Sequence, residues 1–142
     1  MTSETRKAEP PAPTEEPRTT GHREAVGAGA ATKAATVYQI AVYTGDVPNA
    51  GTDADVWLWV DGTMGRSGWR YLDNADDNFE RGKTDYFYLN LPDLGFLTAA
   101  WVYFRRSGSA PGWFLNTVVV NGKTFSYYNW IETNGMYRLT PT

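Results

Sequence analysis

From Val37 to the C-terminus, apolar and polar residues alternate with a period of two, and this alternation constrains the fold most strongly. Glycine, asparagine, aspartate and proline interrupt the alternation at short intervals, as expected between antiparallel strands. Asn121-Gly122 is a strong signal for a two-residue hairpin. No window has the periodicity of an amphipathic helix, so the sequence predicts an all-β antiparallel β-sandwich of eight strands. We expect these strands at 37–44, 55–61, 66–72, 84–91, 97–105, 113–121, 123–128 and 136–140.

The first 35 residues differ in composition from the rest of the chain. They are rich in Pro, Ala, Glu and Thr, and no aromatic residue precedes Tyr38. Such a segment buries too little apolar surface to offset the entropy lost on ordering. We therefore expect a disordered tail or linker over 1–35 and one folded domain over 36–142.

Charge and residue usage exclude several classes of function. The segment 1–35 has five basic and five acidic residues, so residues 36–142, with eight basic and eleven acidic residues, carry the net charge of −3. Nucleic-acid binding requires a basic surface, so we expect no nucleic-acid partner. The chain has no cysteine, and its one histidine is His22. This removes thiolate sites and the usual catalytic base, and we expect no enzyme.

The chain shows no apolar leader after Met1 and no apolar run long enough to span a membrane. A cytoplasmic location is therefore the default expectation, while a peripheral membrane or extracellular location stays open. A monomer is the default for the oligomeric state.

Alternation also assigns side chains to the faces of the predicted sheets. Trp57 and Trp59 share a face with Asp61, which indicates that this face is the wetter one. Tyr86 and Tyr88 form a similar stripe. We expect both stripes to point away from the core, where they either form a contact surface or pair across strands and cover one another.

A set of short segments along the folded part occurs in an order typical of one known domain family. These segments are Tyr43-Thr-Gly-Asp46, Ala50-Gly-Thr-Asp-Ala-Asp-Val56, Phe79-Glu-Arg-Gly82, Asp85-Tyr-Phe87, Pro92-Asp-Leu-Gly95, Gly112-Trp-Phe-Leu115, Val118-Val-Val120, Phe125 and Trp130-Ile131. Read in this order, they resemble the PLAT domain, the lipoxygenase-homology domain of lipoxygenases, pancreatic-type lipases, polycystins and clostridial alpha-toxin. The resemblance implies two four-stranded sheets and a non-catalytic module that brings an enzyme or receptor to a membrane or protein partner, often with loop-bound Ca²⁺. It also implies that Trp113 and Trp130 lie in the core.

Two loops, 49–55 and 73–78, are rich in the oxygen ligands that Ca²⁺ prefers. Their residues are also common turn formers in solvated loops. The family pattern has Asp where this chain has Asn at two of the positions, and Arg105-Arg106 occupies the third loop, so we expect a weak calcium site. By similarity to the alpha-toxin form, the implied ligands are Asn49, Gly51, Thr52 and Asp53 for one ion, with Asp73, Asn74, Asp76 and Asn78 for a second or shared ion.

The leading functional hypothesis is a non-catalytic PLAT-type module that binds a lipid surface or a protein partner. Trp69 and Phe96, near loops, are candidates to meet lipid, with Arg105 and Arg106 able to contact lipid phosphates. One alternative is a carbohydrate-binding module that uses the Trp and Tyr stripes. The other is a purely structural protein-interaction module.

Overall fold

The computed structural model describes residues 13, 17, 35–106 and 112–142, and these contain nine strands. No helix among them is long and apolar enough to cross a membrane. The strands are β1 (Ala35–Thr44), β2 (Asp55–Gly62), β3 (Gly65–Arg66), β4 (Arg70–Tyr71), β5 (Thr84–Pro92), β6 (Leu97–Arg105), β7 (Trp113–Val120), β8 (Lys123–Ile131) and β9 (Gly135–Pro141).

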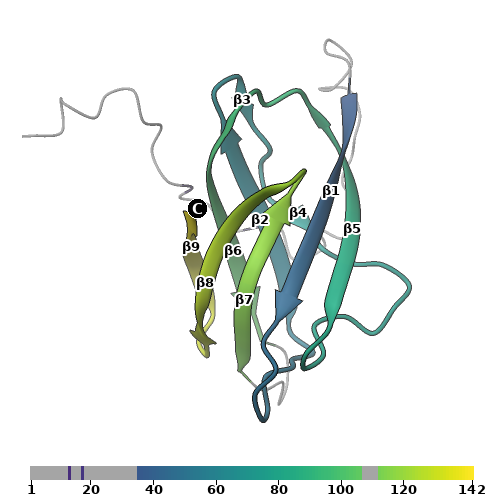
Figure 1. Cartoon of the computed structure of the whole chain (residues 1–142), viewed down its shortest axis with the longest axis vertical. Helices are drawn as coiled ribbons and strands as arrows, with labels where there is room; N and C mark the ends of the chain where they lie inside the picture. Colours follow the sequence, from purple (N-terminus) through teal and green to yellow (C-terminus); the bar gives the residue numbers. More distant parts are fainter. Residues whose placement is uncertain (1–12, 14–16, 18–34, 107–111) are drawn as a thin grey trace, which may run out of the picture.

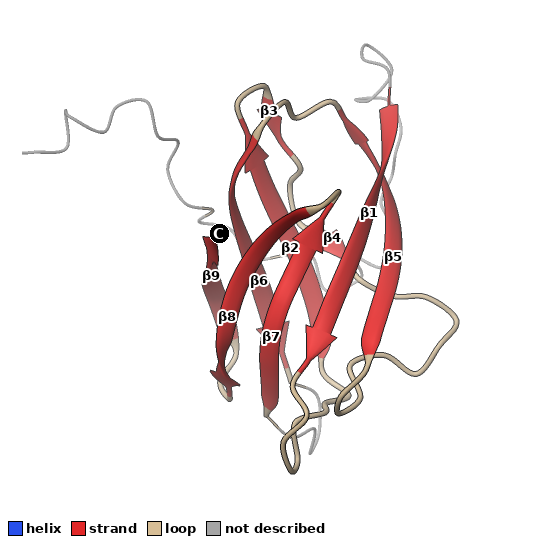
Figure 2. Cartoon of the chain, viewed as in Figure 1, coloured by secondary structure: helices blue, strands red, loops and turns tan. Residues whose placement is uncertain are grey.

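The strands form two layers, as the sequence predicted (Figures 1 and 2). One sheet has the order β5-β1-β7-β8, and the other has β2 between β6 and the short strands β3 and β4, with β9 beyond β6. All pairings are antiparallel. β9 pairs with β6 over most of its length and with β8 at its end, so it joins the two sheets along one side. The prediction of an all-β sandwich is confirmed.

The local signals have two outcomes. The hairpin at Asn121-Gly122 is present, and both residues have the positive φ that a type I′ turn requires (46° and 86°). The single strand expected over 66–72 is wrong, because the chain bends at Gly68 (φ 75°) between β3 and β4. Ser67 holds this bend in place, since its Oγ accepts a hydrogen bond from Val60 N and donates one to Gly68 O.

The core lies between the two sheets and is built from one side of each strand. On β2, Val56, Leu58 and Val60 point into the core and are fully buried, as expected. Trp57 points to the opposite face, which was expected to be exposed, but it is also buried. Trp113 belongs to the core, as expected, but Trp130 does not and instead packs edge-on against Phe114.

The expectation for residues 1–35 falls almost entirely outside the described residues. Two prolines of this segment, Pro13 and Pro17, are described, and both are buried. The first strand begins at Ala35.

Candidate functional site

The loop between β1 and β2 and the segment that leads into β5 meet at one end of the sandwich, the lower end in Figure 1. Thr52 N donates to Phe79 O at 3.0 Å, and Phe114 N donates to Ala50 O at 3.0 Å. Gly51 allows the two segments to approach closely. A Cβ there would lie 3.0 Å from Phe79 O and 3.0 Å from Arg81 N, so a larger residue would push them apart.

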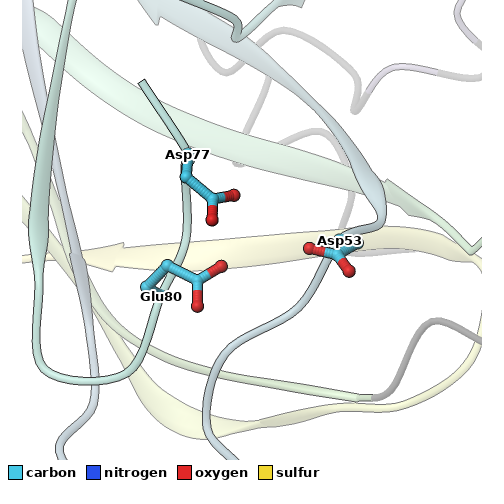
Figure 3. Close-up of side chains that lie close together, drawn as sticks. All are labelled: Asp53, Asp77 and Glu80. Atoms are coloured by element: carbon cyan, nitrogen blue, oxygen red, sulfur yellow. The ribbon is translucent and has the colours of Figure 1, made fainter.

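Three carboxylates converge where these segments meet. One oxygen from each of Asp53, Asp77 and Glu80 lies within 4.8 Å of the others. Figure 3 shows the three side chains pointing toward one another, Asp53 from the β1–β2 loop and the other two from the segment that leads into β5. Hard cations such as Ca²⁺ bind carboxylate and carbonyl oxygens, and this donor set fits that preference.

The electrostatics of the cluster agree with this chemistry. Desolvation raises the pKa of Glu80, and the negative charges of Asp77 and Asp53 raise it further. Three like charges held close together repel one another, and a bound cation would relieve that repulsion.

The ligands expected from the first loop lie together. Asn49, Gly51, Thr52 and Asp53 line an open cavity of about 330 Å³ with Glu80 and Arg81. Thr52 is buried, and its Oγ1 accepts a hydrogen bond from Ala54 N, so this hydroxyl is engaged in holding the loop.

The ligands expected from the second loop differ in their surroundings. Asp73 and Asp76 are exposed, and neither belongs to the carboxylate cluster. The Asn74 side chain donates to Tyr86 O and accepts from Asp76 N, which shapes the loop. Asn78 Oδ1 is buried and has no hydrogen-bond partner among the described residues.

Asp77 and Glu80 are the two members of the cluster that the sequence-based ligand set omits. Asp77 belongs to the oxygen-rich loop 73–78, but the family pattern assigns the ligand positions to its neighbours Asp73, Asn74, Asp76 and Asn78. Glu80 lies beyond that loop, in the Phe79-Glu-Arg-Gly82 segment. Between the two residues, Phe79 has a φ of 63° and its N–H donates to Asp85 Oδ2 at 2.8 Å, and the chain then turns over residues 80–83, where Lys83 N donates to Glu80 O at 3.1 Å. A positive φ at a phenylalanine is uncommon, and the spacing of residues in the sequence does not predict it.

The third-loop arginines are not among the residues that line the cavity beside the carboxylates. The Arg105 guanidinium lies 4.7 Å from the Trp57 ring centroid and 5.4 Å from that of Tyr103. Arg106 donates from Nη1 to Glu132 O. Arg81 is the cation that lines the cavity, and it also pairs with Asp46 at 2.9 Å.

The outer side of β2, β4 and β6 carries five packed rings, which we call the aromatic face: Trp57, Trp59, Trp69, Tyr71 and Tyr103. Their ring centroids lie 5.1 to 6.2 Å apart in tilted or edge-on pairs. Trp57 is only 1% exposed, and Trp59 and Trp69 are half-buried. The stripe does point away from the core, but its rings cover one another, which was one of the two expectations.

Asp61 corrects the expectation that this face is wet. Its side chain is fully buried and accepts hydrogen bonds from Arg66 Nε at 2.9 Å, Arg66 Nη2 at 3.1 Å and Trp59 Nε1 at 2.8 Å. A buried carboxylate is tolerated when it is paired and hydrogen-bonded in this way. The presence of Asp therefore did not indicate exposure.

The outer side of β1 and β5 is different. Tyr86 is 46% exposed and Tyr88 is 63% exposed, on the same face as Val37, which is 58% exposed. Gln39 Nε2 donates to the Tyr88 hydroxyl at 3.3 Å. These tyrosines are exposed on the outer side of their sheet, as the sequence predicted.

The chain is similar to known proteins in sequence. The family model of the PLAT/LH2 domain matches residues 38–141. The human lipoxygenase homology domain-containing protein 1 is 48% identical over 83 residues, which cover 58% of this chain and 4% of that protein.

Solved structures give the same picture. A coral 8R-lipoxygenase, described as activated by calcium through a C2-like domain, matches with a TM-score of 0.65 and 25% identity over 75% of this chain and 17% of its own. A calcium-dependent 11R-lipoxygenase matches with a TM-score of 0.59 and 26% identity over 74% of this chain and 17% of its own. The chain therefore spans a small fraction of these relatives. The sandwich and the family match together show that it belongs to the PLAT/LH2 domain family.

Proposed function

We propose that this chain is a non-catalytic PLAT/LH2 docking domain whose attachment to a lipid surface or a protein partner is regulated by Ca²⁺ bound at Asp53, Asp77 and Glu80. The observation that carries the proposal is the convergence of these three carboxylates on one point. Two lipoxygenases that share the fold are described by their calcium activation or calcium dependence, which supports the same ion here.

The donor set favours modest affinity. Ca²⁺ takes six to eight oxygens, and three carboxylates leave the remaining ligands to backbone carbonyls, to Asn49 or to water. Arg81 lines the same cavity and adds a positive charge. We therefore expect a dissociation constant of about 10⁻⁴ to 10⁻³ M, as in extracellular modules.

A calorimetric titration and a thermal shift at ~10 mM Ca²⁺ test the ion site. We expect Asp53→Asn and Glu80→Gln to abolish the shift. Asp93→Asn is the matched control. Asp93 is an exposed carboxylate in the β5–β6 turn, away from the cluster, and it accepts a hydrogen bond from Gly95 N. Asp73→Asn separates the two ligand sets: loss of binding there would favour the sequence-based set over the carboxylate cluster.

The pH dependence has a defined sign. Because the pKa of Glu80 is raised in the folded protein, its contribution to stability is present below the pKa of an unfolded glutamate and is lost as pH rises through the folded value. Without Ca²⁺, Glu80→Gln should therefore stabilise the domain at neutral pH. Ca²⁺ should stabilise the wild type more as pH rises through the same range, and a pH-independent calcium shift would contradict this role for Glu80.

Sedimentation with phosphatidylserine vesicles, with and without Ca²⁺, tests the docking surface. Phe96 is 84% exposed, but it lies in the β5–β6 turn beside the β2–β3 turn, since Phe96 N donates to Thr63 Oγ1. The eight residues of β2 separate that turn from Asp53. Phe96→Ser should therefore leave calcium-dependent sedimentation intact, whereas Asp53→Asn should remove it. Sedimentation that is absent in both conditions would favour a protein partner.

A second candidate is carbohydrate binding, which the exposure of Tyr86 and Tyr88 favours. The Trp57 ring cannot serve this purpose, because it is buried beneath Arg105. Binding to polysaccharide that is lost in Tyr88→Ala and kept in Tyr128→Ala, a change at another exposed tyrosine, would support it.

A further inference from the structure

The aromatic face lies on the outside of its sheet, yet its central ring is hidden. Trp57 shares its side of β2 with Trp59, away from the core residues Val56 and Leu58. It is nevertheless 1% exposed, and its Nε1 has no hydrogen-bond partner among the described residues. Neighbouring rings on the same sheet cover its edges, and Arg105 lies over its plane.

Arg105 connects this face to the N-terminal segment. Its Nη2 donates to the carbonyl oxygen of Pro17 at 3.2 Å, across 88 positions of sequence. The same guanidinium lies over the rings of Trp57 and Tyr103. Pro17 is therefore placed beside the aromatic face by a direct contact.

Pro13 and Pro17 are both buried, although they come from a segment without any aromatic residue. Four residues of extended chain span at most about 14 Å, so Pro13 lies within that reach of Pro17. Two proline rings at this spacing can both contact one row of aromatic rings, and proline loses little entropy on ordering because its φ is already fixed.

Charge also matches between the two parts. The residues between the prolines are Thr14, Glu15 and Glu16. The outer side of the β2–β6–β9 sheet carries guanidinium groups stacked on its rings, Arg66 on Trp59, Arg105 on Trp57 and Arg138 on Trp101. Acidic side chains between two prolines suit a surface that combines aromatic rings with arginines.

We propose that the aromatic face is a docking site for an acidic, proline-containing segment, and that residues 13–17 of this chain occupy it. This site is separate from the carboxylate cluster and does not depend on the calcium proposal. It gives the N-terminal segment a specific place on the domain.

Paramagnetic labelling of the full chain tests the proposal. The natural chain has no cysteine, so Thr14→Cys provides a single attachment point for a nitroxide. In a ¹⁵N-labelled sample at low concentration, the indole N–H signals of Trp57 and Trp69 should lose intensity, while that of Trp130 on β8 should not. Equal loss at all three indoles, or no loss at any, would overturn the proposal.

Proline variants and a mixing control sharpen the result. Pro13→Ser with Pro17→Ser in the labelled chain should restore the Trp57 and Trp69 signals, whereas Pro10→Ser with Pro11→Ser should not. Arg105→Gln should also restore them, with an unchanged Trp113 indole shift showing that the core is intact. If unlabelled ¹⁵N protein mixed with nitroxide-labelled ¹⁴N protein shows the same losses, the segment docks on a second copy, and occupancy within one chain is wrong.

Discussion

Trp57 and Trp59 on β2 have the same alternating arrangement as Tyr86 and Tyr88 on β5, yet Trp57 is 1% exposed and Tyr88 is 63% exposed. On β2, the chain returns after Gly68 and lays Trp69 and Tyr71 beside the first pair of rings. On β5, which is a sheet edge, the tyrosines have only β1 as a paired neighbour among the described strands. Alternation thus determines which side of a sheet a residue occupies, while the path of neighbouring chain determines whether that side meets water.

The largest test of this contrast is truncation of one ring on each face. Trp57→Ala should lower the free energy of unfolding by about 3 to 5 kcal/mol, because it removes a buried indole and its ring contacts. Tyr88→Ala should change it by no more than about 0.5 kcal/mol, because the ring is exposed. Denaturant unfolding monitored by circular dichroism measures both. Equal losses would mean that the two faces are equally buried in solution.

A smaller effect is expected at the buried carboxylate of the same face. Asp61→Ala removes the partner of Arg66 and leaves the Trp59 N–H unpaired. Breaking a fully buried pair costs about 3 to 5 kcal/mol, but the Arg66 side chain is 34% exposed and can reach water, so we expect about 2 kcal/mol.

The control for Asp61 is an exposed ion pair. Asp46 pairs with Arg81 at the same 2.9 Å, but the two side chains are 79% and 52% exposed. Asp46→Ala should therefore cost less than about 1 kcal/mol. If the Asp61 and Asp46 variants lose equal stability, burial does not distinguish the two pairs.

The smallest expected effect is a loss of stability at alkaline pH that depends on Tyr71. Burial raises the pKa of Tyr71 well above the usual tyrosine value, and its hydrogen bond to Asp55 and the charges of Asp55 and Asp73 raise it further. Its contribution to stability is therefore present below the unfolded value of about 10 and is lost as pH rises beyond it. Unfolding measured between about pH 9 and pH 11 should show a steeper loss in the wild type than in Tyr71→Phe. Parallel curves would place Tyr71 in a solvated environment.

Local sequence signals predicted those parts of the fold that depend on backbone geometry. Asn121-Gly122 forms its hairpin because both residues tolerate a positive φ, a property of the residues themselves. The segment 66–72 has strand-like alternation but bends, because Ser67 hydrogen-bonds to Val60 of β2 and the backbone turns at Gly68, where φ is 75°. That outcome depends on a partner strand that the local pattern does not contain.

The candidate calcium site was also predicted only in part. Oxygen-rich loops indicated a cation site, and Asp53 belongs to the cluster that the structure assembles. Asp77 and Glu80, on either side of the left-handed Phe79, complete it, whereas the exposed residues Asp73 and Asp76 lie outside it. Ligand identity depends on distances across space, which spacing along one loop does not define.

By itself, the sequence determined the strands other than 66–72, the hairpin, the outward direction of the Trp and Tyr stripes and the membership of the family, because each follows from local alternation or from motifs in order. Only the tertiary structure decided which carboxylates meet, and that Asp61 and Trp57 are buried while Tyr88 is exposed. These properties arise where segments far apart in the chain come into contact, and burial, charge pairing and ligand convergence are properties of those contacts.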